Sequence, residues 1–127
     1  IRMRLNTNEQ LLFNFKQQNF ESLTNFKSDL IVANFSLSFC NNKKFNNAWK
    51  TIENSLQTGG YFVGNLFGNK DSWTKNKLDM SFFTKEEVKR LFNRFQIINF
   101  NEIETDKSTA LGNPKHWHFF DIIAKKL

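Results

Sequence analysis

The chain has 127 residues, a length that fits one small domain with a modest core. Sixteen Phe, three Trp and one Tyr supply bulky core side chains, which excludes a disordered chain despite the many Asn and Lys residues. The formal net charge of +6 comes from 18 basic and 12 acidic residues spread along the sequence, which indicates a solvated basic surface rather than a nucleic-acid groove.

A single cysteine, Cys40, excludes an intrachain disulfide and favours a reducing compartment. No apolar run reaches membrane-spanning length, and the first ten residues lack the apolar centre of a signal peptide. We therefore expect a cytoplasmic protein.

Two strands are predicted in the first part of the chain. Residues 10–17 mix apolar and polar side chains in partial alternation, which favours a strand, and a polar connection follows. The run that starts at Asp29 and ends at Phe39 is apolar with few charges, which is typical of a strand covered on both faces. This second strand is predicted to lie at the centre of the sheet.

A helix is predicted after this strand, because the apolar residues change to steps of three and four and so share one helix face: Phe45, Ala48, Trp49, Ile52 and Leu56. Asn41 or Asn42 would cap its start, and Gly59 and Gly60 would end it. Residues 61–67 then form another strand. A strand, helix and strand in this order make a βαβ unit, whose parallel strands bind ligands at their carboxyl ends.

The loop predicted over residues 68–80 is long and contains a tryptophan, and loops of this length often border a site. Thr84 and Glu87 have the spacing of a capping box, so a helix should begin there, and Phe95 should close it.

Two further strands are predicted over residues 95–107 and 115–126. The loop between them contains a Gly-Asn-Pro turn signal. Such a short connection favours an antiparallel pair at the edge of the sheet.

Two runs of the sequence, DLIVANFSLSFCN and SLQTGGYFVGNLFG, resemble the fourth strand and the turn and fifth strand of class I S-adenosylmethionine-dependent methyltransferases. Within that family, FGNKDSW, FFTKEEVKRLF and KHWHFFDIIAKK are similar to the tellurite-resistance (TehB-like) subgroup. The resemblance implies an α/β fold, with a partial Rossmann-like sheet of family strands three to seven and an antiparallel C-terminal hairpin. It also implies S-adenosylmethionine as methyl donor and a small-molecule acceptor.

The sequence departs from the family in its cofactor-binding half. Such enzymes begin with a strand, a glycine-rich loop and a helix, and that loop lets the cofactor approach the backbone closely. All five glycines of this chain lie after the fourth-strand run, and the acidic residue that ends the family's second strand is also missing. We expect residues 1–127 to be a single C-terminal portion of a methyltransferase domain that binds S-adenosylmethionine weakly or not at all.

The family's strand order, 3-2-1-4-5-7-6, would leave the strand from Asp29 to Phe39 unpaired along one edge. An apolar bare edge invites pairing with another chain, so we expect a homodimer or swapped association through this strand. The alternative is a non-catalytic methyltransferase-like remnant that acts as an interaction or dimerisation module. A nucleic-acid partner is a third alternative, although the chain lacks a clustered basic stripe.

The resemblance also implies positions for the cofactor. Asn19 and Phe20 match the position that meets the adenine, and the end of the fourth strand, where the family contacts cofactor and substrate, matches Asn34, Phe35 and Ser36. The alternatives are that Asn19 and Phe20 lie in an ordinary loop, and that Asn34, Phe35 and Ser36 belong to a buried strand. Methyl transfer mainly requires alignment of the reacting atoms, so these positions would act by orienting the cofactor.

The candidates on the substrate side follow the fifth strand or lie on the last strand: Phe67, Asp71, Trp73, His116 and His118. An acidic residue beside an aromatic one could receive a cationic or soft acceptor, although a plain surface loop fits equally well. The two histidines are two apart on a strand and should project from one face, but no third ligand accompanies them, so no metal site is predicted. Cys40 fits a small buried residue.

Overall fold

The computed structural model describes residue 4, residues 6–9 and 12–127 in full, and the backbone of residues 10 and 11. Three helices, four strands and two 3-10 turns follow one another in this part of the chain: α1 (Thr7–Leu12), β1 (Ser28–Ala33), η2 (Leu37–Phe39), α2 (Phe45–Ser55), β2 (Leu56–Phe67), η3 (Ser72–Lys75), α3 (Lys85–Leu91), β3 (Phe95–Ser108) and β4 (Pro114–Lys126). None of these helices combines the length and apolar character needed to cross a membrane.

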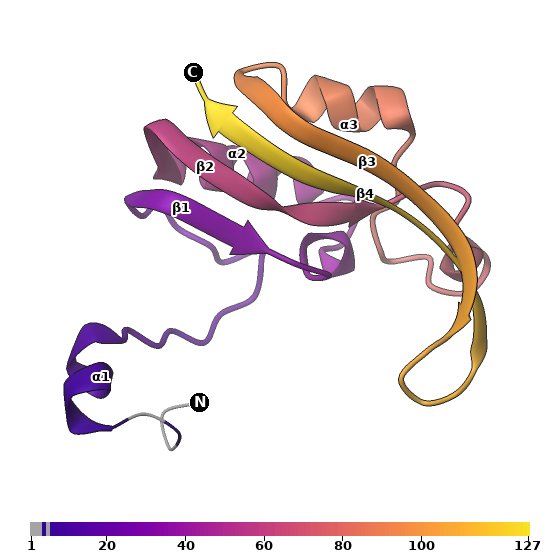
Figure 1. The fold of residues 1–127 in the computed structure, drawn as a ribbon, viewed down its shortest axis with the longest axis horizontal. Helices are drawn as coiled ribbons and strands as arrows, with labels where there is room; N and C mark the ends of the chain where they lie inside the picture. The colour runs from indigo at the N-terminus through magenta and orange to yellow at the C-terminus, as the bar shows by residue number, and fades with distance from the viewer. Residues whose placement is uncertain (1–3, 5) are drawn as a thin grey trace.

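The four strands form one mixed sheet in the order β1-β2-β4-β3 (Figure 1). β1 and β2 are parallel and are joined through α2, as the βαβ prediction requires. β4 pairs antiparallel with β2 on one side and with β3 on the other. The order therefore confirms the α/β fold and corresponds to family strands four, five, seven and six.

The core lies on one face of this sheet, under α2 and the end of α3. Trp49 of α2 lies 5.5 Å from Phe62 of β2 and 4.9 Å from Phe92, measured between ring centroids. The Trp49 indole N–H donates a hydrogen bond to the carbonyl oxygen of Leu91, at 3.1 Å. Because aromatic side chains bury large apolar areas, these contacts fix both helices against the same face.

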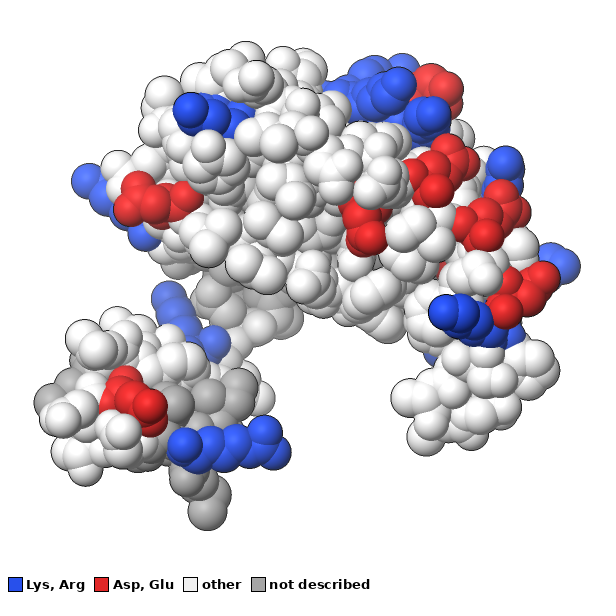
Figure 2. Space-filling model, in the orientation of Figure 1, with Lys and Arg blue, Asp and Glu red and all other residues white. Residues whose placement is uncertain are grey.

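The opposite face of the sheet is not covered by any helix in the described part of the chain. Leu30 and Val32 of β1 are 55% and 58% exposed, and Tyr61 of β2 is 40% exposed. Figure 2 shows few charged side chains near the middle of this face, and α1 stands apart from it at the end of an extended segment (Figure 1). We call this surface the open face.

The strand predicted over residues 10–17 is wrong. The chain forms α1 up to Leu12 and then runs without regular structure to Ser28. Strands are stable only beside a neighbour, and the family's strand three pairs with strand two, which the described residues do not contain. The sheet therefore holds family strands four to seven instead of three to seven.

The strand predicted from Asp29 to Phe39 is shorter and less buried than expected. It ends at Ala33, and a turn at Asn34 and Phe35 then leads into η2. β1 lies at the edge of the sheet and not at its centre. Its side chains on the open face, Leu30 and Val32, are exposed because no helix in the described part of the chain covers that face. The prediction that both faces of this strand are buried is therefore wrong, because half of its apolar side chains lie on the open face.

The helix boundaries also differ from the predicted ones. α2 starts at Phe45 after Lys44, with no side-chain cap from Asn41 or Asn42, and ends at Ser55 instead of at the glycines. β2 begins at once with the buried residue Leu56. The burial of Leu56 at the start of β2 therefore sets the end of the helix, and the glycines at 59 and 60 do not.

The capping box at Thr84 is confirmed, because the Thr84 hydroxyl accepts from the Glu87 N–H at 3.2 Å and the Glu87 carboxylate accepts from the Thr84 N–H at 3.0 Å. Phe95 does not close that helix. It is the first residue of β3, and its ring packs 5.2 Å from that of Phe92.

Candidate functional site

The turn after β1 holds a strained residue. Phe35 has a φ of 45°, a left-handed conformation that is rare for a bulky side chain, and its N–H donates to the Asn65 Oδ1 at 2.7 Å. Such backbone strain costs on the order of 1–3 kcal/mol and clusters at functional sites. The turn leaves the Phe35 ring 46% exposed at the carboxyl end of the parallel strands.

The carboxyl ends of β1 and β2 are linked through Ser38 of η2. The Phe67 N–H donates to the Ser38 hydroxyl oxygen at 2.8 Å, and the Ser81 N–H donates to the Ser38 carbonyl oxygen at 2.8 Å. Ser38 is buried. The segment after β1, the end of β2 and the chain before α3 therefore form one connected edge.

An aromatic cluster covers this edge. Neighbouring ring centroids lie 5.2 to 6.2 Å apart, within the range of favourable aromatic pairs. Its members come from the β1 turn, η2, the end of β2, η3 and β4: Phe35, Phe39, Phe67, Trp73, Trp117 and Phe119. The fold thus brings the predicted residues Phe35, Phe67 and Trp73 together.

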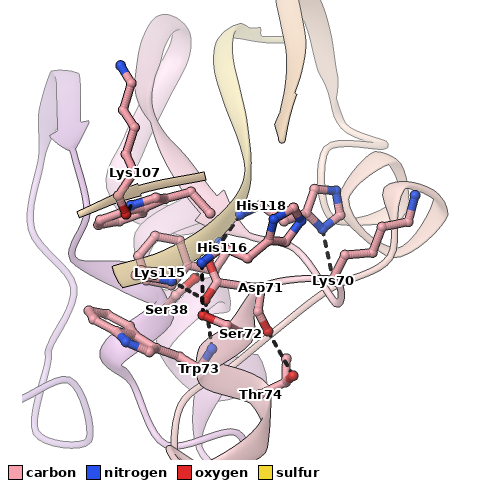
Figure 3. A network of polar contacts seen from close by, with 12 residues as sticks. Ser38, Lys70, Asp71, Ser72, Trp73, Thr74, Lys107, Lys115, His116 and His118 are labelled. Atoms are coloured by element: carbon pink, nitrogen blue, oxygen red, sulfur yellow. Dashed lines mark hydrogen bonds and ion pairs between the residues drawn. The ribbon is translucent and has the colours of Figure 1, made fainter. Parts of the chain in front are cut away.

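A buried ion pair lies under the aromatic cluster, between the Lys115 ammonium and the Asp71 carboxylate (Figure 3). The two side chains are 1% and 0% exposed. The Lys115 Nζ lies 4.1 Å from the ring centroid of Trp73 and 4.4 Å from that of Trp117, so both indoles stabilise the cation. Burial lowers the pKa of Lys115, while the hydrogen bond and charge of Asp71 oppose that shift.

Asp71 also fixes the loop after β2. Its Oδ1 accepts from the Trp73 N–H at 2.9 Å, and its Oδ2 accepts from the His118 N–H at 3.1 Å. Because these contacts and Lys115 occupy both carboxylate oxygens, Asp71 positions Trp73 against β4. Asp71 itself is buried beneath the rings of the cluster.

His116 and His118 project from the same face of β4, as predicted, but that face is opposite the one that carries Trp117. His118 is buried; its Nδ1 accepts from the Lys70 N–H at 3.0 Å, and its Nε2 lies 3.2 Å from the Glu102 carboxylate. Neither histidine has a ring contact with the aromatic cluster among the described residues. Their positions therefore favour a role in holding the β3–β4 hairpin.

His116 bridges two carboxylates of β3. Its Nδ1 lies 2.7 Å from Asp106 and its Nε2 lies 2.7 Å from Glu104. The hydrogen bonds to Asp106 and Glu104 raise the pKa of His116 above its ordinary value of 6.5. The hydrogen bond with His116 in turn lowers the pKa of Glu104. Both shifts favour the imidazolium between two carboxylates.

Asn19 and Phe20 lie elsewhere. The Asn19 side chain accepts from the Ser22 N–H at 2.8 Å, and Phe20 packs against the core and lines a cavity of about 140 Å³ beside α2. In the described part of the chain, no hydrogen bond or ring contact joins them to Asn34, Phe35 or Ser36. The adenine role therefore stays a prediction for these two residues.

Cys40 is 1% exposed, and burial, followed by the charge of Glu21, raises the pKa of its thiol. A buried thiol with a raised pKa is poorly reactive, in agreement with the prediction of a small core residue. The described residues contain no cluster of three or more His, Cys, Asp or Glu side chains that could hold a metal ion.

Sequence reasoning missed Lys115 and Phe39. Lys115 alternates with Trp117 and Phe119 on one face of β4, and that spacing was the available signal. A lysine is rarely buried without a partner, and the partner, Asp71, lies on a distant loop. The pairing therefore depends on the tertiary fold.

No family model and no curated protein matches this sequence. Solved structures do match. The structure of TehB from Haemophilus influenzae superposes with a TM-score of 0.73 at 19% identity, over 95% of this chain and 44% of that one. An S-adenosylmethionine-dependent methyltransferase from Methanosarcina mazei superposes with a TM-score of 0.62 at 27% identity, over 89% of this chain and 66% of that one.

The chain has the class I methyltransferase fold. It spans less than two thirds of the length of both structures. A third match, the N-methyltransferase NodS from Bradyrhizobium japonicum, was solved in complex with S-adenosylhomocysteine and superposes with a TM-score of 0.57 at 11% identity, over 91% of this chain and 58% of that one.

Substitution of Gly68 by Ala should destabilise the protein. An added Cβ would lie 2.0 Å from the Nδ1 of His118, a buried ring that is held on both nitrogens. We expect a loss of about 1–3 kcal/mol in the free energy of unfolding, measured by urea denaturation. The exposed neighbour Asn69→Ala is the matched control and should change it by less than about 0.5 kcal/mol. Equal stability of the two variants would show that the ring is free to move.

The bridge at His116 should make stability depend on pH. Because the folded pKa of His116 is raised, its contribution is complete below the ordinary value of 6.5 and disappears as pH rises through the folded value. The difference in unfolding free energy between the wild type and His116→Gln should therefore shrink as pH is raised from mildly acidic to alkaline. Denaturation at a series of pH values measures this difference. A difference that stays constant or grows as pH rises would contradict the bridge between His116 and the two carboxylates.

Proposed function

We propose that this chain forms the acceptor-side part of an S-adenosylmethionine-dependent methyltransferase that acts on a small molecule. The aromatic cluster at the carboxyl ends of β1 and β2 carries this proposal, because ligands of α/β sheets bind at that edge. The fold shared with TehB and other methyltransferases supports it. A tellurite-resistance role, as in the TehB-like subgroup, and a cytoplasmic location belong to the same proposal.

The residues of this edge would act by orientation. S-adenosylmethionine supplies an electrophilic methyl group on a sulfonium centre, so transfer needs alignment more than acid or base catalysis. The exposed ring of Phe35 would contact the cationic cofactor, since aromatic faces attract cations. The indoles of Trp73 and Trp117 would hold the acceptor, and the Lys115–Asp71 pair would fix their positions.

The residues present fit only part of this cofactor. Asn34, Phe35 and Ser36 can form one wall, because their turn stands exposed at the end of an edge strand. The chain offers no glycine-rich loop for the methionine part and no strand-end carboxylate for the ribose. We therefore propose that these 127 residues are a C-terminal portion of the domain, with weak or no activity alone.

Titration with S-adenosylhomocysteine tests this proposal. We expect no binding at micromolar concentration by calorimetry and, at millimolar concentration, backbone amide shifts in NMR spectra that are confined to residues 34–36 and their neighbours. Phe35→Ala should abolish the shifts. Phe26→Ala, which removes a ring of similar exposure at the opposite end of β1, should retain them: the two rings are 46% and 41% exposed.

Micromolar binding would contradict the partial site. Absence of any shift at millimolar concentration would contradict the assignment of residues 34–36 to the cofactor.

A second candidate function is that of an interaction or dimerisation module. The observation that favours it is the edge position of β1, which pairs with β2 on one side only among the described strands. Its backbone groups can accept another strand, and β1 itself exposes the apolar side chains of Leu30 and Val32 on the adjoining open face. We propose that a second copy of the chain pairs along β1.

Size-exclusion chromatography with light scattering should then show a dimer. Val32→Lys places a charge on the open face beside the paired edge and should shift the protein toward the monomer. Leu78→Lys introduces the same charge at a residue that is 74% exposed in the loop before α3, and it should leave the dimer intact. A wild-type chain that stays monomeric would rule out this association.

A further inference from the structure

A groove lies beside the aromatic cluster, between the η3 loop and the tip of the β3–β4 hairpin. Its volume is about 880 Å³, within the range of small-molecule sites. Trp73 and Trp117 line one part, and Leu111 and Pro114 of the hairpin line another. The two indole centroids are 5.9 Å apart with an interplanar angle of 47°. The groove therefore combines two indoles with aliphatic side chains.

The groove carries positive charge without a carboxylate to balance it. Lys75 and Lys77 line it, its lining contains no Asp or Glu, and neither lysine forms an ion pair with any described residue. The Lys77 Nζ lies 5.0 Å from the ring centroid of Trp73. Asp71, which N-caps η3, is already paired with Lys115. The charge of Lys77 also helps to lower the pKa of Lys115, after the larger effect of burial.

We propose that this groove binds a planar small molecule that carries a carboxylate or a similar anionic group. The indoles offer surfaces on which a flat ring can stack, and the two lysines can pair with its anionic group. A cationic ligand would be repelled by Lys75 and Lys77, whose charges no carboxylate in the lining balances. The binding stands by itself, whereas the assignment of this ligand as the methyl acceptor rests on the proposed function.

The test uses the three tryptophans as reporters. The indole N–H signals of Trp49, Trp73 and Trp117 are followed in NMR spectra of the 127-residue chain during titration with 2-naphthoate, without any cofactor. We expect the signals of Trp73 and Trp117 to shift. The signal of Trp49 should stay in place, because Trp49 is buried in the core and does not line the groove. The affinity for the neutral analogue 2-naphthamide should be lower by roughly fivefold or more.

The double variant K75Q/K77Q should lose the preference for the anion, with the naphthoate affinity falling roughly fivefold or more. K43Q/K50Q removes the same charge from exposed positions around α2, outside the groove, and should bind like the wild type. Equal affinity for naphthoate and naphthamide, or an effect of the control equal to that of K75Q/K77Q, would overturn the anion site. Shifts of all three indoles, or of none, would overturn the groove as the binding site. Because no cofactor is present, none of these outcomes depends on methyl transfer.

Discussion

The buried ion pair between Lys115 and Asp71 organises the edge of the sheet on which the candidate site is built. Two opposite charges without access to water need each other, since removal of either would leave an uncompensated charge in the interior. Through Asp71 the pair fixes the loop after β2, and through Lys115 it fixes the indoles of Trp73 and Trp117. Two segments that are distant in sequence, the loop after β2 and the start of β4, therefore have one relative arrangement.

The helix-covered face of the sheet and its carboxyl edge are stabilised in different ways. On one side, α2 and the residues around α3 bury Phe62 and Phe92 against Trp49, and apolar packing dominates. At the carboxyl edge, the order comes from hydrogen bonds to Ser38 and Asp71 and from a strained turn at Phe35. Packing thus supplies the general stability, whereas polar contacts and strain set the geometry of the site.

Much of the fold could be predicted from local pattern. The spacing of Trp49 and its neighbours and the Thr84 capping box depend on residues close in sequence, and both elements form. The strand expected over residues 10–17 needed a neighbour that no local pattern can supply. At the site, Phe67 and Trp73 were found from their place after a strand, whereas Lys115 was missed because its burial depends on a loop more than forty positions earlier.

The position of β4 between β2 and β3 has a consequence for how the protein is made. Tyr61 pairs with Lys125 and Phe67 with Phe119. The strand pairing with the greatest sequence separation in the sheet is therefore the one between β2 and β4. During synthesis, β2 must wait with one side unsatisfied until residues 114–126 have left the ribosome, and pairings of such sequence separation form slowly. The interval exposes an apolar strand to other nascent chains, so this stage of folding is the one most open to aggregation.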